Sequence, residues 1–194
     1  MDAKYITPAV TAFDHEGHVD MEANKRIYQW LIEGGMDGIL ILGSIGEFFA
    51  IPMEEKKRMI QEALDYVDHR VTVYVGTGGT VFEECVELSR FALDRGADGV
   101  MVISPYYFNL PDSSILNFYD TLAGQLDGPV LLYNFPARTG YDLKPEVVLE
   151  LARRRKNIVG IKDTVDVMGH TRELIQTVKR EYPEFLVYSG FDEF

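Results

Sequence analysis

The sequence predicts an α/β protein with parallel strands, and a (β/α)8 TIM barrel rather than an open doubly wound sheet. Short apolar runs alternate with longer amphipathic segments along the chain, and this alternation indicates parallel strands joined by right-handed helical crossovers. Polar and aromatic residues gather where the apolar runs end, which is the face where barrel enzymes keep their sites. The glycine fingerprint of dinucleotide-binding sheets is incomplete, because Val81 stands at the place of its third glycine.

The expected strands are apolar runs that end in turn residues. In chain order they span 6–13, 38–46, 71–79, 99–107, 129–136, 158–164 and 185–191. The expected helices carry apolar residues at a spacing of three to four, and they span 19–35, 52–70, 80–97, 112–126, 144–155 and 168–183. Gly34, Gly35 and Gly96 stand where helix ends favour a residue with positive φ.

This count of about seven strands and six helices falls one βα unit short of a closed barrel. We therefore expect a single barrel domain over residues 1–194 that is truncated before the eighth unit. No linker or change of composition marks a second domain. A catalytically silent truncated barrel that acts as an interaction module is the alternative that the missing unit raises.

Composition excludes several classes of function. The net charge is −12 and the pI about 4.7, which argues against nucleic-acid binding through phosphate contacts. Cys85 is the single cysteine, so we expect no internal disulfide and a reducing compartment. No run approaches the roughly 18 apolar residues of a membrane helix, and the opening MDAKYITPAV lacks the pattern of a signal peptide. We expect a cytoplasmic protein without membrane association. The spacing of the histidines does not match a zinc site.

Lys162 closes the apolar run that begins at Ile158. Alternation along a strand puts Gly160 and Lys162 on one face, and Val159 and Ile161 on the other. If the branched residues pack against the helices, Lys162 points into the barrel and Gly160 leaves space beneath it. Burial disfavours the charged form of an amine, and a neutral amine can attack a carbonyl to form a Schiff base. The alternative is a lysine at a strand end that reaches solvent.

Residues at other strand ends fit the same chemistry. Tyr133 ends the preceding strand and can point inward beside Lys162, where a phenol could pass protons; alone it would be a core aromatic. The stretch GSIGEF supplies the Ser44 hydroxyl and a turn whose backbone N–H groups could hold a carboxylate. Arg138 offers a two-pronged donor for a second carboxylate, or it is a surface loop arginine.

Four motifs together make the chain similar to a known family. GSIGEF resembles the G-[ST]-x-G-E signature of the dihydrodipicolinate synthase / N-acetylneuraminate lyase family, YNFPARTG resembles its Y-N-x-P-x-R-T-G, GIKDT resembles its Schiff-base strand, and SPYYF also matches. The motifs occur in order across essentially the whole chain. The resemblance implies a (β/α)8 barrel and a lysine Schiff-base lyase or aldolase that acts on pyruvate or another 2-keto acid without metal or organic cofactor.

The resemblance also implies roles for individual residues. Lys162 is the Schiff-base lysine, Tyr133 the proton relay and Ser44 the relay hydroxyl. Tyr107 is a relay tyrosine that reaches into a neighbouring subunit's site, so a homodimer or homotetramer is expected. Arg138 corresponds to the arginine that holds the carboxylate of the aldehyde substrate. Gly43, Ile45 and Gly46 complete the turn expected to bind substrate, with Ile45 where most members have a second hydroxyl residue.

The motifs point to two substrate classes. Arg138 favours 4-hydroxy-tetrahydrodipicolinate synthase, which condenses pyruvate with aspartate semialdehyde in lysine biosynthesis. GTGGT and YNFPA also resemble the sugar-acid aldolase branch, which splits 2-keto-3-deoxy acids into pyruvate and an aldehyde and often lacks that arginine. The synthase is the first expectation and the aldolase the alternative.

Overall fold

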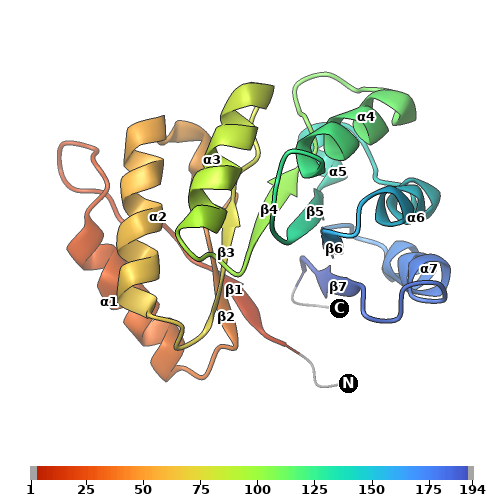
Figure 1. The fold of residues 1–194 in the computed structure, drawn as a ribbon. Helices are drawn as coiled ribbons and strands as arrows, with labels where there is room; N and C mark the ends of the chain where they lie inside the picture. Colours follow the sequence, from red (N-terminus) through yellow and green to blue (C-terminus); the bar gives the residue numbers. More distant parts are fainter. Residues whose placement is uncertain (1–3, 192–194) are drawn as a thin grey trace. The chain divides into compact units, whose positions relative to one another are not determined.

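The structure is a computed structural model that describes residues 4–191. Figure 1 shows the alternation of strands and helices along the chain. The strands are β1 Ile6–Pro8, β2 Gly38–Ile41, β3 Thr72–Gly76, β4 Gly99–Ile103, β5 Val130–Asn134, β6 Ile158–Asp163 and β7 Leu186–Ser189. The helices are α1 Met21–Glu33, α2 Met53–Val67, α3 Phe82–Asp94, α4 Asp112–Ala123, α5 Pro136–Thr139, α6 Pro145–Arg154, α7 Met168–Val178 and the 3₁₀ helix η1 Phe48–Ala50.

All seven expected strands and all six expected helices are present among the described residues. The strands are shorter than predicted, and the first ends at Pro8 rather than at Phe13. Helix α5 was not predicted, because its single turn lies inside the motif YNFPARTG. Gly35 and Gly96 have the expected positive φ of 82° and 91°. The prediction for Gly34 is wrong: its φ is −70°, and Gly35 makes the left-handed turn instead. Residues 1–3, the start of the opening MDAKYITPAV in which no signal peptide was predicted, lie outside the described range.

Contacts divide the chain into two compact units. The amino-terminal unit comprises the chain up to Thr77 together with Glu87–Val100, and the carboxyl-terminal unit comprises Gly78–Val86 together with the chain from Met101 onward. The boundary between the two units runs through α3 and through β4. The prediction of one domain stays a prediction.

In the amino-terminal unit β2 pairs in parallel with β1 and with β3. Every residue of β2 is buried, as expected of a strand covered on both faces. The α1 helix begins where the Asp20 side chain accepts a hydrogen bond from the Ala23 N–H at 3.0 Å, an ordinary N-cap. Helix α1 buries Tyr28 and Leu31, and α2 buries Met59 and Ile60.

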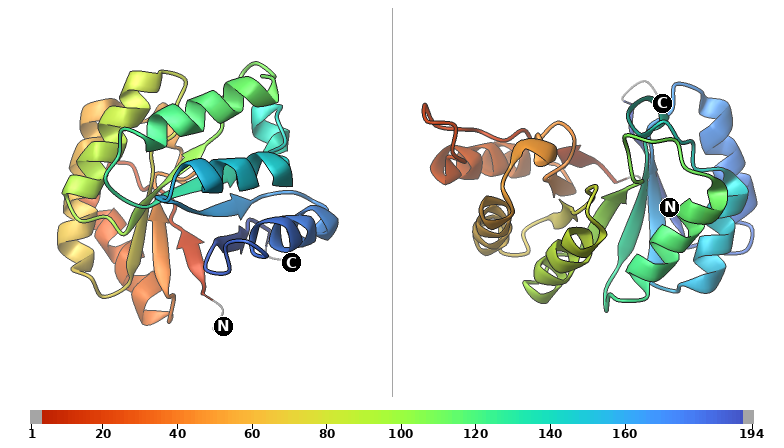
Figure 2. Two further views of the ribbon diagram at one scale, coloured as in Figure 1. Left: turned by 45° about the vertical axis from the view of Figure 1, so that its right-hand side comes forward. Right: turned by 90° about the horizontal axis from the view of Figure 1, so that it is seen from above.

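In the carboxyl-terminal unit β6 pairs in parallel with β5 and with β7. Helices α4, α6 and α7 lie along one face of these three strands (Figure 2). Helix α6 buries Val148 and Leu151. The Asn157 amide ties the start of β6 to the chain between α4 and β5 by donating to the carbonyls of Ala123, Leu126 and Gly128 at 2.9, 3.0 and 3.3 Å.

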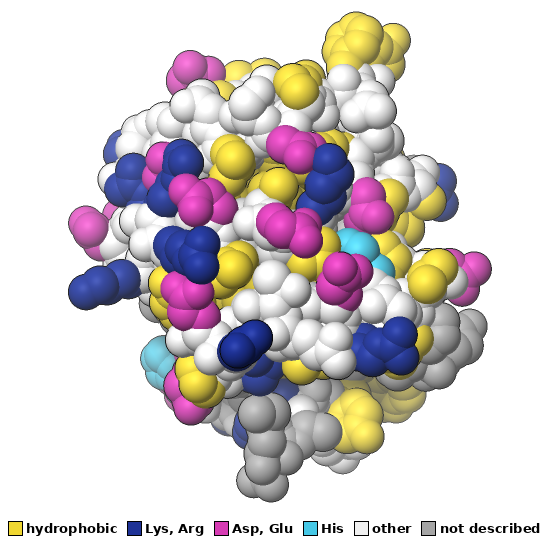
Figure 3. All heavy atoms as spheres, turned by 90° about the vertical axis from the view of Figure 1, so that its right-hand side faces the viewer, with side chains coloured by type: hydrophobic (Ala, Val, Ile, Leu, Met, Phe, Trp, Pro, Cys, Tyr) yellow, Lys and Arg dark blue, Asp and Glu magenta, His cyan; other side chains and the backbone are white. Residues whose placement is uncertain are grey.

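The outer surface of this helical layer carries interspersed acidic and basic side chains (Figure 3). Exposed ion pairs join Arg153 to Glu181 at 2.8 Å and Arg154 to Glu150 at 2.8 Å. Such pairs contribute little to stability. These pairs show that part of the chain's charge belongs to an ordinary solvent-exposed helical surface. No helix within residues 4–191 is long and apolar enough to cross a membrane.

Candidate active site

Lys162 and Tyr133 lie side by side at the carboxyl ends of two paired strands. Tyr133 in β5 is directly opposite Lys162 in β6, and the Lys162 Nζ lies 4.8 Å from the centroid of the tyrosine ring. Tyr133 is 5% exposed, and Lys162 is half-buried. An ammonium at this distance is attracted by the negative face of the ring. The ring therefore holds the lysine head at the end of the strand.

Both side chains project from the face of the sheet that α7 does not cover. Asp163, the residue after Lys162, accepts a hydrogen bond from the Thr171 hydroxyl of α7 at 2.7 Å. Successive residues of a strand point to opposite faces, so Lys162 points away from α7. We call the face of β5, β6 and β7 that is opposite to the helices the inner face. The expected orientation of Lys162 is thus present in this unit.

The aromatic surface beside Lys162 continues toward Arg138. The rings of Tyr133 and Phe135 are stacked, with centroids 6.0 Å apart. The Arg138 guanidinium carbon lies 5.8 Å from the centroid of Phe135. A cation therefore stands at each end of a pair of aromatic rings. Arg138 is exposed and belongs to α5, so its guanidinium can meet a solvent-borne carboxylate.

Gly160 and Tyr188 define the other side of Lys162. A Cβ on Gly160 would lie 2.7 Å from the Leu186 Cβ and 2.8 Å from its carbonyl oxygen. The close approach of β7, rather than space for the lysine, therefore requires glycine here. Tyr188 in β7 is directly opposite Lys162, so it projects from the same face. The sequence predicts no role for Tyr188, because only the pairing of β6 with β7 places it beside Lys162.

The motif GSIGEF forms the turn after β2, in the amino-terminal unit. The N–H groups of Glu47 and Phe48 donate to the carbonyls of Ser44 and Gly43 at 3.2 and 3.5 Å. The Gly46 carbonyl accepts the Thr11 hydroxyl at 2.7 Å. A Cβ on Gly46 would lie 3.0 Å from the Ala9 carbonyl oxygen, which explains the second glycine of the motif.

Exposure within this turn varies along the motif. Gly43 and Gly46 are buried, and Ser44 is half-buried. Ile45 is 58% exposed, so a large apolar side chain stands at the outside of the turn. The binding of a carboxylate by this turn stays a prediction.

Tyr107 lies in the loop that follows β4. Its φ of 87° is unusual for a residue with a Cβ, and its side chain is 85% exposed. The ring of Phe108 meets it edge to face at a centroid distance of 5.0 Å. Both rings are exposed in the loop after β4 and do not belong to the core.

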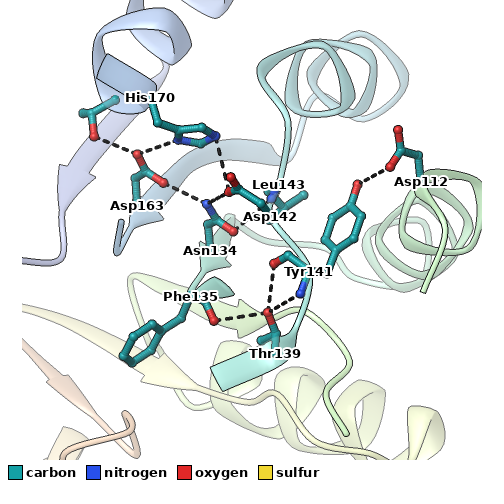
Figure 4. A network of polar contacts seen from close by, with 10 residues as sticks. Asp112, Asn134, Phe135, Thr139, Tyr141, Asp142, Leu143, Asp163 and His170 are labelled. Carbon is teal, nitrogen blue, oxygen red and sulfur yellow. Dashed lines mark hydrogen bonds and ion pairs between the residues drawn. The ribbon is translucent and has the colours of Figure 1, made fainter. Parts of the chain in front are cut away.

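A polar network that the sequence analysis missed lies on the opposite side of β5 and β6 (Figure 4). The Asn134 amide nitrogen donates to Asp163 at 2.9 Å and to Asp142 at 2.8 Å, and the Asn134 amide oxygen accepts the Leu143 N–H at 3.0 Å. The His170 Nδ1 lies 3.0 Å from Asp163. The one signal in the sequence for this network is that Asn134 directly follows Tyr133 and Asp163 directly follows Lys162.

The network shifts the pKa values of two of its members. Burial alone would raise the pKa of Asp163, but hydrogen bonds from His170, Asn134 and Thr171 outweigh it and lower the pKa. The hydrogen bond to Asp163 raises the pKa of His170 against the opposing effect of burial, and the Asp142 charge adds to the rise. Asp163 is therefore an ionised carboxylate, and His170 favours the charged form.

Comparison with known proteins places the chain in a family. A model of the dihydrodipicolinate synthetase family matches residues 2–194. The Escherichia coli K12 protein named "Putative 2-dehydro-3-deoxy-D-gluconate aldolase YagE" is 44% identical over 97% of this chain and 62% of its own length. The 4-hydroxy-tetrahydrodipicolinate synthase of Salinibacter ruber is 36% identical over 97% of this chain and 62% of its own length.

Solved structures agree with this result. The crystal structure of YagE in complex with pyruvate has a TM-score of 0.95 at 44% identity, and the match covers 98% of this chain and 64% of that chain. Dihydrodipicolinate synthase from Aquifex aeolicus has a TM-score of 0.92 at 31% identity, covering 97% of this chain and 63% of that chain. The chain thus spans less than two thirds of the length of these relatives. The predicted (β/α) barrel class is confirmed, and the chain belongs to the dihydrodipicolinate synthetase family.

Proposed function

We propose that the protein joins or splits a carbon–carbon bond through a Schiff base between Lys162 and pyruvate. The observation that carries this proposal is the pairing of Lys162 with Tyr133, with 4.8 Å between the amine nitrogen and the ring centroid. An amine that attacks a carbonyl must lose a proton and later expel water, so it needs an acid–base group nearby. The Tyr133 ring that Lys162 contacts carries a phenol hydroxyl, which can serve as this acid–base group.

The proposed reaction needs no metal or organic cofactor. The Lys162 amine adds to the C2 carbonyl of pyruvate, and loss of water leaves an iminium ion. The iminium draws electrons from C3, so that C3 loses a proton and becomes an enamine nucleophile. The enamine adds to an aldehyde, and water then releases the product; splitting a 2-keto-3-deoxy acid is the same path reversed. Tyr133 moves protons at the carbinolamine stage.

Two substrates remain candidates, each favoured by a different observation. Arg138 stands at the far end of the aromatic pair and supports an aldehyde with a carboxylate, such as aspartate semialdehyde. The names of two relatives, at 44% and 40% identity, support cleavage of a 2-dehydro-3-deoxy sugar acid. The half-reaction at Lys162 is common to both.

The family pattern supports a further proposal, that the other relay groups are Ser44 and Tyr107. It also supports the proposal that the turn of Gly43, Ile45 and Gly46 binds a carboxylate. The exposed Tyr107 ring fits a residue that completes the site of a second copy of the chain. A homo-oligomer is therefore part of the proposal. Sedimentation of the wild type and of Tyr107→Ala tests it, and an unchanged mass for the variant would remove Tyr107 from the interface.

Trapping of the iminium tests the function as a whole. Borohydride reduces the pyruvate imine to a stable secondary amine, and mass spectrometry of peptides locates it. We expect the added mass on Lys162 and its absence from Lys162→Ala. Lys156→Ala, which removes an exposed lysine before the start of β6, is the matched control and should trap normally. Wild-type protein that gains no mass would favour the silent-barrel alternative.

An aldehyde panel then separates the two substrates. Pyruvate is combined with aspartate semialdehyde, glyceraldehyde or glycolaldehyde, and its consumption is followed. Turnover with aspartate semialdehyde alone supports the synthase, and turnover with the uncharged aldehydes alone supports the aldolase.

A further inference from the structure

Two carboxylates on different segments flank the side chain of His170. Asp163 of β6 lies 3.0 Å from the Nδ1, and Asp142, in the loop between α5 and α6, lies 3.4 Å from the Nε2. The His170 side chain is 15% exposed. Asp163 and Asp142 are the charged groups that raise the His170 pKa most, and the Leu143 backbone also contributes. His170 thus joins the strand of Lys162 to the loop that follows β5.

The geometry favours a doubly protonated ring. A neutral imidazole has one N–H and one lone pair, so one ring nitrogen would turn a lone pair toward a carboxylate. The imidazolium has an N–H on both sides: the Nδ1 is hydrogen-bonded to Asp163, and the Nε2 lies within ion-pair distance of Asp142 without a hydrogen bond among the described residues. His170 lies in the first turn of α7, where the helix dipole disfavours a cation. The two carboxylates oppose that effect, and the pKa of His170 is raised.

The loop held by this ring carries Arg138. Between Phe135 and Lys144 the chain returns to the network, where Leu143 and Asp142 bond to Asn134. The Thr139 hydroxyl fixes the middle of the loop by donating to the carbonyls of Phe135 and Tyr141 at 3.1 and 2.9 Å. Figure 4 shows His170 at the Asp142 end of this path. Asp142 is thus held from two sides, by the Asn134 amide and by the His170 ring.

We propose that His170 is a positioning residue, which as an imidazolium clamps the loop 135–144 against β6 and so holds Arg138 in place relative to Lys162. It contacts no substrate in this proposal, and it acts through Asp142 and Asp163. This inference rests on the proposed function only for its effect on catalysis. The effect on the loop itself does not depend on the reaction.

Three variants distinguish a charged clamp from a merely structural histidine. His170→Gln removes the charge and keeps an amide donor for Asp163. Asp142→Asn removes one carboxylate and keeps an oxygen to accept the Asn134 bond. Arg153→Gln is the matched control, because it breaks the exposed pair with Glu181 at 2.8 Å and leaves the loop alone.

Hydrogen exchange of the amides in residues 135–144, corrected for the intrinsic dependence on pH, gives the first readout. In the wild type and in Arg153→Gln, we expect exchange to rise about tenfold as the pH rises through the His170 pKa, because the ion pair between the imidazolium and Asp142 is lost. His170→Gln should exchange fast at every pH. In Asp142→Asn the transition should move to lower pH. A transition that persists in His170→Gln, or that does not move in Asp142→Asn, overturns the proposal.

Kinetics give the second readout. For an aldehyde that carries a carboxylate, such as aspartate semialdehyde, KM should rise about tenfold in His170→Gln, while KM for an uncharged aldehyde and the borohydride trapping of pyruvate on Lys162 stay at their wild-type values. Equal loss of trapping would make His170 a residue of the Schiff-base step and overturn the positioning role. Failure of the wild type to trap pyruvate would defeat the proposed function instead, and the exchange measurement would still decide the clamp.

Discussion

Tyr133 and Lys162 face each other across the pairing of β5 with β6, with the amine nitrogen 4.8 Å from the centre of the ring. The residues that follow them, Asn134 and Asp163, also pair and bond to each other at 2.9 Å. Two strands thus present a nucleophile and a phenol on the inner face, and a hydrogen-bonded polar network on the helix face. The bond between Asn134 and Asp163 supports the register of β5 with β6, and this register places Tyr133 opposite Lys162.

Loss of the amine should abolish turnover. We expect Lys162→Ala and Lys162→Arg to be inactive, because alanine has no nucleophile and a guanidinium stays protonated. The folds should remain nearly intact, since Lys162 is only half-buried at a strand end. Steady-state assays and thermal unfolding check both points. Near wild-type turnover in either variant would exclude the imine.

Loss of the phenol should slow the reaction without abolishing it. Tyr133→Phe keeps the ring that contacts Lys162 and deletes only the hydroxyl. We expect a fall in kcat of about 10²–10⁴, the usual range for a positioned acid–base group. Tyr66→Phe, which deletes a phenol bonded to Gln29 at 3.1 Å, is the matched control. A change of only a few fold in Tyr133→Phe would mark it as a packing residue.

Arg138 should discriminate between substrates. Arg138→Ala should weaken transition-state binding by roughly 1.5–3 kcal/mol for aspartate semialdehyde, because a charge-assisted carboxylate contact is lost. Uncharged aldehydes should show no change in kcat/KM. Arg138→Lys keeps the charge without the two-pronged geometry, and we expect an intermediate loss. Equal effects on charged and uncharged aldehydes would give Arg138 a structural role.

A side chain on Gly160 should separate two strands. In Gly160→Ala the new Cβ would lie 2.7 Å from the Leu186 side chain and 2.8 Å from its backbone oxygen. The backbone oxygen cannot move aside alone, so we expect a loss of about 1–3 kcal/mol in the free energy of unfolding, as for overpacking. Denaturant unfolding measures it. Gly169→Ala is the comparison, because its nearest neighbour is a Val167 side-chain atom at 3.4 Å. Equal stability of both variants would contradict the close approach of β7.

The stability of the fold should depend on pH through His170. Its pKa is raised in the folded state, because of Asp163 and Asp142, so the folded state binds its proton more tightly than the unfolded chain. The stabilisation is complete below the unfolded pKa of about 6.5 and is lost as pH rises through the folded pKa. The free energy of unfolding of the wild type minus that of His170→Gln should therefore fall from pH 6 upward. A difference that is constant with pH would show that the ring charge plays no part.

The sequence alone determined the fold class and the chemically unusual residues. Alternation of apolar runs with amphipathic segments depends on local periodicity, and within residues 4–191 it located the seven strands and the six longer helices. Lys162 and Tyr133 were identifiable because polar groups at the ends of buried strands conflict with burial unless they serve a purpose, and Arg138 because its guanidinium is a two-pronged donor for a carboxylate. The short helix α5 escaped, because one turn of helix leaves no periodic pattern.

Only the tertiary structure decided which residues touch. The place of Tyr188 beside Lys162 and the clash that requires Gly160 both follow from the register of β6 with β7, and register arises from pairing between segments distant in the sequence. The clamp of His170 between Asp163 and Asp142 likewise joins three segments. No local pattern encodes such contacts, because burial and hydrogen bonding reward them only after the chain has brought the segments together.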